Sequence, residues 1–342
     1  MISHNPTVIF RKAVPDGALP VAGEHIVSDD TCTIDLENVR LGGGFLTETI
    51  AVTPESSMRL RMRPREKADF VTTFNLNEPL VGFGLVKVLR SEEDSIKEGD
   101  ILMGLTPWQK YTVQPYVEAD PAGAFPVEQY LVALGNPGMA AYFALHGLAK
   151  IKTASIISIC TSMRLLTRPS LAIQLAKQAG STVIASAGSE SKLEYLRDLG
   201  ADHVFNYQTD GYVHPLAKHG PVDIVIDCVG GEALEAAIEH ASFKAQIIIV
   251  GASADYGVPA SERYGVKNME YVFQKALKIS GLFMLDQLDL FEEYFSVIPE
   301  MLKSGKVTSR ILRVDGLKNG PQAMVNMLTG NGGQVGKPII FV

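Results

Sequence analysis

Cysteine is scarce in this chain, and its few cysteines lie far apart. Among 342 residues there are only three: Cys32, Cys160 and Cys228. A small disulfide-built protein needs several closely spaced cysteine pairs, so that class is excluded. No two of these cysteines have the short spacing of a zinc cluster, and we expect a protein without a bound metal. Scattered cysteines suit a reducing compartment, so we also expect a cytoplasmic protein.

Long apolar runs and an excess of basic residues are also missing. No apolar run reaches the length of a membrane span, and no basic-then-apolar leader opens the chain. The formal net charge is -7, which disfavours nucleic acid and anionic membranes as partners. A hydrophobic content of 46% and a charged content of 20% are ordinary for an α/β protein with two domains. The expected partner is therefore a small molecule.

Two regions of different pattern follow one another. The first 125 residues contain short β-type runs separated by Gly, Pro and charged turns. Beyond about residue 150, strands and helices alternate, as they do around a doubly wound parallel sheet. The tail contains runs that we interpret as strands returning to the first region. We predict an α/β fold with a β-rich domain of residues 1–125 and 305–342 and a Rossmann-like domain of residues 126–304.

The expected elements of the second region alternate regularly. The expected strands are Ala154–Ile159, Thr182–Ala185, His203–Phe205, Asp223–Asp227, Gln246–Val250 and Ile279–Leu282. The expected helices are Met139–Ala149, Pro169–Ala179, Ser191–Leu199, Gly231–Ala241 and Leu290–Ser304.

The residues after the expected strand Thr182–Ala185 indicate which nicotinamide cofactor binds. In a dinucleotide-binding βαβ unit this strand ends near the adenine ribose, where an NAD-binding protein places Asp or Glu. Here Gly188 and Ser189 follow with no acid before Glu190, and Lys192 adds a positive charge. A helix that begins near Ser189 also supplies free backbone N–H groups and the positive end of its dipole. The sequence therefore predicts NADPH, because these groups suit its 2′-phosphate.

Glycine is missing where the same cofactor needs it most. The turn before the helix that begins near Ser170 should be glycine-rich, so that the backbone can approach the pyrophosphate. The chain holds 31 glycines, yet none lies between Gly147 and Gly180. Side chains stand in the turn at Met163, Leu166 and Pro169 instead.

Three explanations of this turn stay open. It is a real loop in which Arg164 and Arg168 replace part of the lost N–H donors, since guanidinium groups pair well with phosphate. Pro169 at a first helical position would then keep the helix start and its dipole. Alternatively, the turn has drifted because the protein no longer binds a dinucleotide. Finally, the segment comes from a misread exon or frame.

Short motifs follow one another in order along nearly the whole chain. They include Met58-Arg59-Leu60-Arg61, Val81-Gly82-Phe83-Gly84, Asn136-Pro137-Gly138-Met139, Gly188-Ser189-Glu190-Ser191-Lys192, Phe205-Asn206-Tyr207, Val229-Gly230-Gly231 and Val335-Gly336-Lys337. Together they resemble the medium-chain dehydrogenase/reductase superfamily, in its zinc-independent branch of prostaglandin reductases and alkenal or enone double-bond reductases. The resemblance implies a GroES-like barrel beside the Rossmann domain, NADPH as the cofactor and a homodimer.

The resemblance also implies functional residues. Ser189 and Lys192 would hold the 2′-phosphate, and Tyr207 would lie against the adenosine end. Tyr256 matches a tyrosine thought to assist catalysis. The full set of cofactor-binding residues implied in this way is Met139, Ala140, Gly188, Ser189, Lys192, Tyr207, Gly251, Phe283 and Gln334.

Several positions depart from the family pattern. Glu55-Ser56-Ser57 replaces an Asp-Pro-Tyr motif, so an aromatic wall of the substrate cleft is missing. Gln334 replaces an asparagine that meets the cofactor, and Cys228 replaces another asparagine. Arg59 and Arg61 alternate along an expected strand, and we interpret them as solvated or salt-bridged.

Three functions are consistent with these observations. The first is an NADPH-dependent reductase of the C=C bond of α,β-unsaturated ketones and aldehydes, for example in specialised metabolism. The second is a quinone reductase of the same fold. The third is a catalytically impaired homologue or binding protein, because the glycine turn is replaced at residues 161–169.

Overall fold

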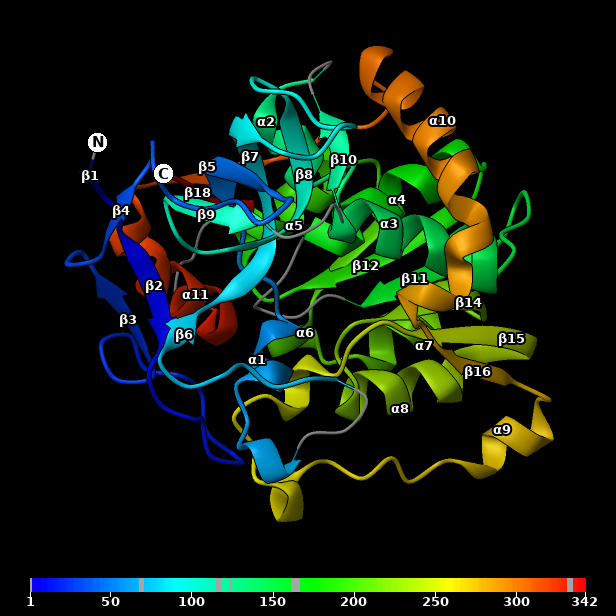
Figure 1. Cartoon of the computed structure of the whole chain (residues 1–342). Coiled ribbons are helices and arrows are strands. Elements are labelled where there is room, and N and C mark those ends of the chain that lie inside the picture. Colours follow the sequence, from blue (N-terminus) through cyan, green and yellow to red (C-terminus); the bar gives the residue numbers. More distant parts are fainter. Residues whose placement is uncertain (1, 68–70, 115–118, 123–124, 161–166, 331–334) are drawn as a thin grey trace. The chain divides into compact units, whose positions relative to one another are not determined.

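A computed structural model of the chain describes residues 2–67, 71–114, 119–122, 125–160, 167–330 and 335–342. Its contacts divide the chain into two compact units (Figure 1). The first contains Met1–Leu131, Ile311–Gly333 and Lys337–Val342, and the second contains Val132–Arg310 and Gln334–Gly336.

Both boundaries between the units lie six residues later than in the sequence-based division, which placed them after residues 125 and 304. The short helix α2 (Val127–Leu131) was expected in the nucleotide-binding domain. It packs instead against β7 (Val81–Ser91), a strand of the first unit, and therefore belongs to that unit. On the return, the first unit resumes at Ile311.

The first unit is built on mainly antiparallel sheets, in which β17 and β18 form a parallel pair. Its largest sheet has the strand order β10-β8-β7-β5-β18-β17, with β9 also paired to β5. The pairing of β5 with β7 shifts register twice, and such irregularities bend a strand. One edge of β5 accordingly pairs with β9 over its first half and with β18 at its end. The strands of this unit are β1 (Ile2–His4), β2 (Thr7–Phe10), β3 (Ile26–Asp29), β4 (Thr33–Asp35), β5 (Phe45–Val52), β6 (Glu78–Pro79), β7, β8 (Ile101–Pro107), β9 (Tyr111–Gln114), β10 (Ala119–Ala122), β17 (Ile311–Asp315) and β18 (Lys337–Phe341).

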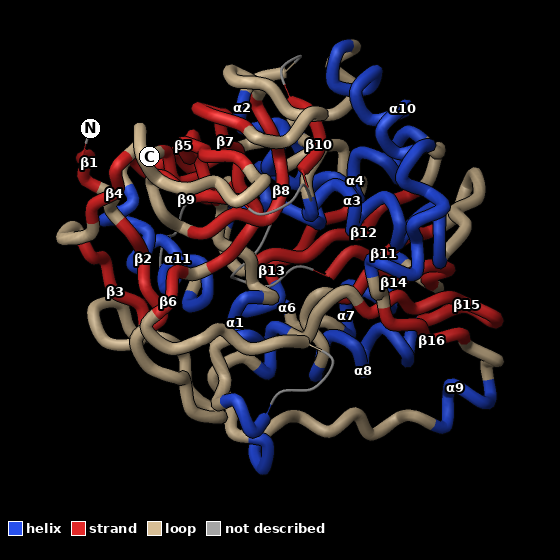
Figure 2. Tube along the Cα trace, in the orientation of Figure 1, coloured by secondary structure: helices blue, strands red, loops and turns tan. Residues whose placement is uncertain are grey.

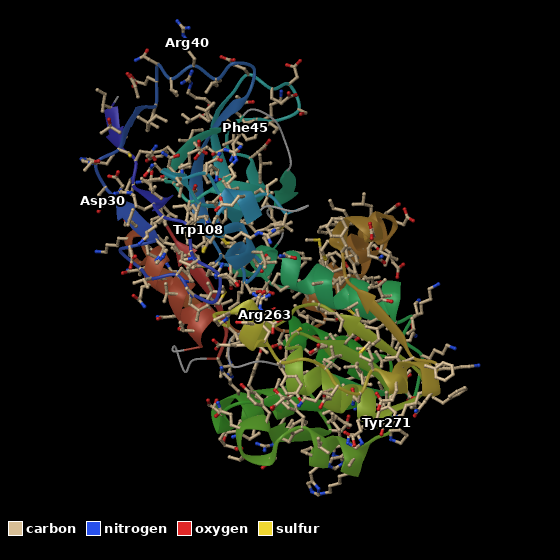
Figure 3. All side chains as sticks on the ribbon, turned by 90° about the horizontal axis from the view of Figure 1, so that it is seen from below. Asp30, Arg40, Phe45, Trp108, Arg263 and Tyr271 are labelled. Atoms are coloured by element: carbon tan, nitrogen blue, oxygen red, sulfur yellow. The ribbon has the colours of Figure 1, made fainter. Side chains whose placement is uncertain are left out.

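Trp108 lies in the core of the first unit (Figure 3). Its side chain is fully buried, and glycines approach it from two sides. A Cβ atom added to Gly82 would lie 3.0 Å from the indole Nε1, and one added to Gly320 would lie 3.4 Å from the ring. Gly320 begins α11 (Gly320–Thr329), a helix that the sequence analysis did not predict. Close packing on the tryptophan therefore places this helix against the strands.

A buried ion pair fastens the C-terminal strand of the first unit. Lys337 Nζ lies 2.6 Å from a carboxylate oxygen of Glu55, and both side chains are almost fully buried. The same ammonium donates to the carbonyl oxygen of Pro54 at 2.8 Å. Removing one partner of such a pair leaves an uncompensated buried charge, which strongly destabilises the folded protein. Glu55, a departure from the family pattern, therefore has a structural role here.

The expected strand around Arg59 and Arg61 is wrong. Residues Met58–Arg61 form a short helix, α1, because Met, Leu and Arg are good helix formers whose propensity outweighs the alternating pattern. Arg59 is buried and donates to the carbonyl oxygens of Pro15 and Ala18. Arg61 lies 4.1 Å over the ring of Phe74. Both arginines therefore hold loops of the first unit together.

The second unit contains the predicted parallel sheet. Its strand order is β13-β12-β11-β14-β15-β16, and every pair in it is parallel. The chain leaves β11 towards one end of the sheet and later leaves β14 towards the other. The strand order therefore reverses between these two strands, and open α/β sheets bind their ligands at the carboxyl ends of the strands at such a point. The strands are β11 (Ile156–Cys160), β12 (Thr182–Ala187), β13 (His203–Asn206), β14 (Val222–Asp227), β15 (Ala241–Ile249) and β16 (Lys278–Gly281).

Helices cover both faces of this sheet. In Figures 1 and 2, α3, α4 and α10 lie on one side of the strands, and α7 and α8 lie on the other. The first group includes a packed pair, α3 with α4, and so does the second, α7 with α8. A two-domain α/β fold with a Rossmann-like sheet is thereby confirmed. The helices are α3 (Asn136–Tyr142), α4 (Thr167–Gln178), α5 (Glu190–Asp198), α6 (Tyr207–Asp210), α7 (Val213–His219), α8 (Gly231–His240), α9 (Glu270–Gln274) and α10 (Phe291–Lys303).

The expected helix Met139–Ala149 is divided in two. An α-helix, α3, ends at Tyr142, and a π-helix follows from Phe143 to Leu148. A Cβ atom added to Gly138 would lie 2.0 Å from the carbonyl oxygen of Ala133 and 2.5 Å from the hydroxyl of Tyr294. Only glycine permits this approach, which gives a physical reason for the glycine in the Asn136-Pro137-Gly138-Met139 motif.

Candidate functional site

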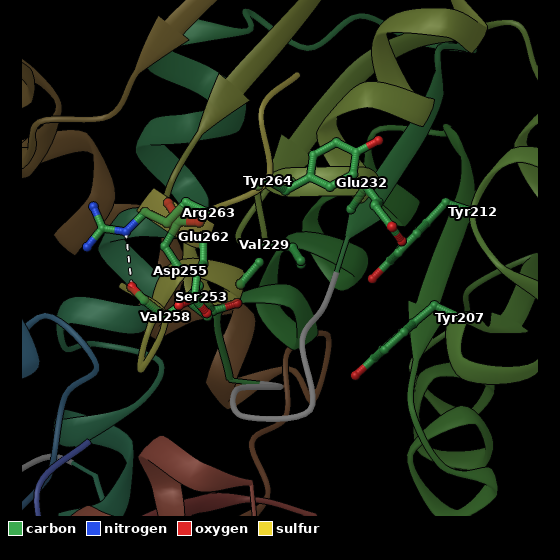
Figure 4. Close-up of a pocket in the computed structure, with 14 residues that line it drawn as sticks. Tyr207, Tyr212, Val229, Glu232, Ser253, Asp255, Val258, Glu262, Arg263 and Tyr264 are labelled. Atoms are coloured by element: carbon green, nitrogen blue, oxygen red, sulfur yellow. Dashed lines mark hydrogen bonds between the residues drawn. The ribbon is translucent and has the colours of Figure 1, made fainter. Parts of the chain in front are cut away.

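The carboxyl edge of the parallel sheet carries a cavity of about 430 Å³ (Figure 4). Open α/β sheets bind their ligands at this edge, next to the point where the strand order reverses. Segments that follow β13, β14 and β15 all reach the cavity. It is lined by Tyr207, Tyr212, Val229, Gly230, Gly231, Glu232, Ala233, Ser253, Ala254, Asp255, Val258, Glu262, Arg263 and Tyr264.

Two tyrosines form the aromatic wall of the cavity. The rings of Tyr207 and Tyr212 are parallel, with an interplanar angle of 4° and 5.4 Å between their centroids. Figure 4 shows both hydroxyl groups pointing the same way into the cavity. Burial raises the pKa of the Tyr212 hydroxyl, which therefore stays protonated and can act as a hydrogen-bond donor. Tyr207, which the sequence analysis expected at the adenosine end of the cofactor, lines this cavity.

The start of α8 forms the floor of the cavity. Gly230 and Gly231 have φ angles of +74° and +54°, a region that glycine enters without strain. The buried carboxylate of Asp227 accepts hydrogen bonds from the N–H groups of Val229 and Gly230. Burial raises the pKa of Asp227 to about 6, while the two N–H donors oppose that shift. This carboxylate fixes the tight turn that opens the helix.

The end of β12 presents groups suited to an anion. Ser189 stands at the N-cap of α5, and its half-buried hydroxyl does not cap the helix but lies 3.3 Å from that of Ser191. The first-turn N–H groups of α5 point towards this side. Lys192 is 8% exposed, and burial lowers its pKa. No acid stands between Ser186 and Ser189. A bound anion would compensate the cost of burying the ammonium, so these residues fit a 2′-phosphate.

The other expected residues are distributed over the second unit. Met139 and Ala140 are buried in α3, and Phe283, which follows β16, is 46% exposed. Gly251 is half-buried after the end of β15. Tyr256 is half-buried at the end of a single 3₁₀ turn, directly after the lining residue Asp255. None of these residues is among those that line the cavity, and Gln334 lies outside the described residues.

The replaced turn falls largely outside the described residues as well. Residues 161–166, which include Met163, Arg164 and Leu166, are not described. Pro169 is the third residue of α4, not the first as expected. It still lies in the first turn, where an N–H group has no partner within the helix.

Sequence reasoning missed several lining residues. Tyr212, Glu232 and Tyr264 were not singled out. The Val229-Gly230-Gly231 motif at a helix start was the signal that could have located Glu232. Tyr212 and Tyr264 reach the cavity through tertiary packing, which leaves no pattern in the sequence.

Two features are absent from the described parts of the chain. No group of three or more His, Cys, Asp or Glu side chains in these parts of the chain is placed to hold a metal ion. No helix in the described ranges is both long and apolar enough to cross a membrane.

Comparisons with known proteins agree with this architecture. The family described as "N-terminal domain of oxidoreductase" matches residues 30–121, and that described as "Zinc-binding dehydrogenase" matches residues 170–303. The chain is 31% identical to "Dehydrogenase FUB6" of Gibberella moniliformis, over 99% of this chain and 98% of that protein. It is 27% identical to "2-alkenal reductase (NADP(+)-dependent)" of Nicotiana tabacum, over 91% and 90% of the two chains. The crystal structure of CurA from Vibrio vulnificus in complex with NADPH has the same fold, with a TM-score of 0.86, 23% identity and coverage of 98% and 99%.

The fold and the site define a two-domain α/β protein with a cavity at the carboxyl edge of a doubly wound sheet. The chain belongs to the medium-chain dehydrogenase/reductase superfamily, in its zinc-independent alkenal reductase branch. The resemblance in the sequence motifs is thereby confirmed.

Proposed function

We propose that the protein is an NADPH-dependent oxidoreductase that reduces the C=C bond of α,β-unsaturated ketones and aldehydes. The single observation that carries the cofactor assignment is the end of β12, where Ser189 and the buried Lys192 stand with no acid. The tobacco relative is by name an NADP(+)-dependent 2-alkenal reductase, which supports both the cofactor and the substrate class.

Different residues of the second unit would bind different parts of the cofactor. Ser189, Lys192 and the first turn of α5 would hold the 2′-phosphate, with Gly188 leaving room for it. Tyr207 would lie against the adenosine end, where its ring already forms a cavity wall. Met139, Ala140, Gly251, Phe283 and Gln334 are assigned to the rest of the cofactor through the family resemblance.

The chemistry places few demands on side chains. When bound, NADPH supplies a hydride, and in this reaction the β-carbon of the unsaturated carbonyl compound accepts it. Negative charge then develops on the carbonyl oxygen, and a nearby O–H donor lowers the barrier. Tyr256 is our candidate for this donor and for the proton that reaches the α-carbon. Its place directly after the lining residue Asp255 supports this assignment.

The cysteines bear on where the protein works, and the altered turn bears on a competing function. All three cysteines are free thiols, which suits a reducing compartment, and we assign the protein to the cytoplasm on that basis. An impaired homologue is the competing function, since Met163, Leu166 and Pro169 stand in the turn where glycines would let the pyrophosphate approach.

Steady-state assays with purified protein test this function. We expect NADPH consumption with an α,β-unsaturated ketone or aldehyde, a saturated carbonyl product, and a fall in kcat of at least about tenfold for Tyr256→Phe. Preferred reduction of quinones would instead make the protein a quinone reductase of the same fold. Absence of both NADPH binding and turnover would identify an impaired homologue and contradict the proposal.

A further inference from the structure

A long segment passes over the start of α8 and forms one wall of the cavity. We name residues 252–268 the strap. Its side chains from Ser253 to Tyr264 supply seven of the cavity-lining residues, and Tyr256 lies within it. Because the strap contains only short 3₁₀ turns, its position depends on contacts with its neighbours.

The N-terminal end of the strap, which we call its near end, is fastened by backbone hydrogen bonds. The N–H of Ser253 donates to the carbonyl oxygen of Cys228 at 3.2 Å, and that of Ala254 donates to Val229 at 2.9 Å. Both acceptors directly follow β14. This end therefore moves only with the sheet.

The strap then packs closely on the first residue of α8. A Cβ atom added to Gly231 would lie 3.5 Å from Cβ of Ala254 and 3.6 Å from Cβ of Tyr264. Two positions of the strap that are ten residues apart thus meet at one glycine. Between them, the bond from Arg263 Nε to the carbonyl oxygen of Val258, at 3.3 Å, joins the strap to itself and not to the helix.

The C-terminal end of the strap, which we call its far end, is held by one carboxylate of α8. Glu235 accepts from the hydroxyl of Tyr264 at 2.8 Å and from the backbone N–H of Lys267 at 2.6 Å. These bonds hold the pKa of Glu235 below its ordinary value, the Lys267 N–H contributing most. The Lys267 ammonium also lies 4.7 Å over the ring of Tyr264, and Asn268 donates to the Glu235 carbonyl oxygen at 2.8 Å.

We propose that Glu235 is a positioning residue: its carboxylate clamps the far end of the strap to α8 and keeps the cavity wall in the ligand-binding conformation. The inference rests on the proposed function for its ligand, NADPH, but not for the clamp itself. If the clamp is lost, the strap spends part of its time away from α8. The apparent Kd for the ligand then rises, because it equals the intrinsic Kd divided by the fraction of molecules in the competent conformation.

The test compares Glu235→Ala and Glu235→Gln with Glu239→Gln, an exposed acid one turn further along α8. Hydrogen exchange of strap amides is measured without ligand, and NADPH affinity is measured by fluorescence. For Glu235→Ala we expect roughly tenfold faster exchange at residues 253–267 and a Kd roughly tenfold higher. Glu235→Gln keeps an acceptor oxygen, so its exchange rate and its Kd should lie between those of the unaltered protein and those of Glu235→Ala. Glu239→Gln should match the unaltered protein in both.

Kinetics separate positioning from a general loss of folded protein. A displaced strap raises KM for NADPH more than it lowers kcat, because saturating ligand restores the closed wall. A partly unfolded variant would lower kcat and leave KM unchanged. If Glu235→Ala does not fold, Tyr264→Phe removes one of the two bonds to the carboxylate and should show a smaller shift of the same kind.

Failure of the clamp and failure of the proposed function give different results. Strap exchange in Glu235→Ala that equals exchange in Glu239→Gln would overturn the clamp, whatever the affinity for NADPH. If the unaltered protein does not bind NADPH, the proposed function fails, and the exchange measurement still decides the role of Glu235.

Discussion

At the scale of single residues, the proposed function makes Lys192 the residue that distinguishes the two cofactors. Lys192 is 8% exposed in the first turn of α5, which Ser189 precedes as the N-cap residue, and an anionic ligand would offset the cost of its burial. We expect the protein to bind NADPH at least about tenfold more tightly than NADH, about one charge-assisted hydrogen bond's difference. Lys192→Ala should remove most of that preference while leaving NADH affinity nearly unchanged, as measured by fluorescence titration.

A second cation on the same helix provides the control for Lys192. Arg197 pairs with Glu190 at 2.7 Å on the exposed side of α5, so Arg197→Ala should leave the cofactor preference intact. Equal affinities for NADPH and NADH in the unaltered protein would contradict the assignment.

Asp227 gives the stability of the second unit a particular pH dependence. Its carboxyl has a pKa of about 6 in the folded protein against an ordinary 3.8, so the folded state binds more protons between these values. The contribution to the free energy of unfolding is therefore fully present below pH 3.8 and is lost as pH rises through about 6. Relative to Asp227→Asn, which cannot ionise, the unaltered protein should lose about 3 kcal/mol over this window.

Urea unfolding of both proteins at a series of pH values measures this difference. The carboxylates with lowered pKa values elsewhere in the chain affect both proteins equally and cancel in the comparison. Parallel pH profiles would show that Asp227 ionises as easily in the folded protein as in the unfolded chain.

At the scale of elements, the sequence was informative where hydrophobic periodicity coincides with burial. All six strands of the parallel sheet were predicted. The central strands β11, β12 and β14 are runs rich in Ile, Val and Ala that are mostly buried, whereas the edge strands β13 and β16 are more exposed. Helices α4, α5, α8 and α10 were predicted within a few residues of their ends. The short helix α1 was predicted as a strand, because four residues are too few to show a helical period.

The candidate site was predictable only in part, for a physical reason. Ser189, Lys192 and Tyr207 follow strand ends, and the carboxyl edge of a parallel sheet can be read from the strand pattern. Tyr212 and Tyr264 reach the site through tertiary packing, and Glu235 meets Tyr264 from a segment far away in sequence, which no local pattern encodes.

The start of α3 offers a direct test of close packing. In Gly138→Ala the new methyl group would overlap the carbonyl oxygen of Ala133, so the backbone must shift. We expect a loss of roughly 3 kcal/mol or more in the free energy of unfolding, measured by urea denaturation. Gly281→Ala in β16 is the matched control, since nothing lies within 4 Å of its added Cβ. Equal effects of the two substitutions would contradict the steric argument.

The turn at residues 161–169, which runs into the first turn of α4, offers a second test at this scale. Its sequence places Met163, Leu166 and Pro169 where the family resemblance implies a glycine-rich turn, so backbone contact with the pyrophosphate should be poor. We expect the protein to fold but to bind NADPH weakly, and a glycine-rich turn at residues 161–169 to strengthen binding. Calorimetric titration of both proteins measures the change. Micromolar affinity in the unaltered protein would instead favour the loop in which Arg164 and Arg168 replace the lost donors.

At the scale of the whole molecule, we expect a homodimer formed through the second unit. In the part of the chain that the structure describes, β16 ends the parallel sheet, so one of its edges carries unpaired backbone groups. Leu285 and Leu288, which follow β16, are 62% and 57% exposed. An exposed strand edge flanked by large apolar side chains is favourable for pairing with a second copy around a twofold axis.

Sedimentation velocity of three proteins decides this expectation. The unaltered chain should sediment as a dimer, and the double variant Leu285→Glu, Leu288→Glu should sediment as a monomer, because each introduced charge would be buried in the interface. Phe273→Glu is the control: Phe273 is 87% exposed on α9, the helix that precedes β16, and its variant should remain dimeric. A monomeric unaltered protein would exclude the dimer. Dissociation by Phe273→Glu alone would place the interface on α9 and leave the β16 edge free.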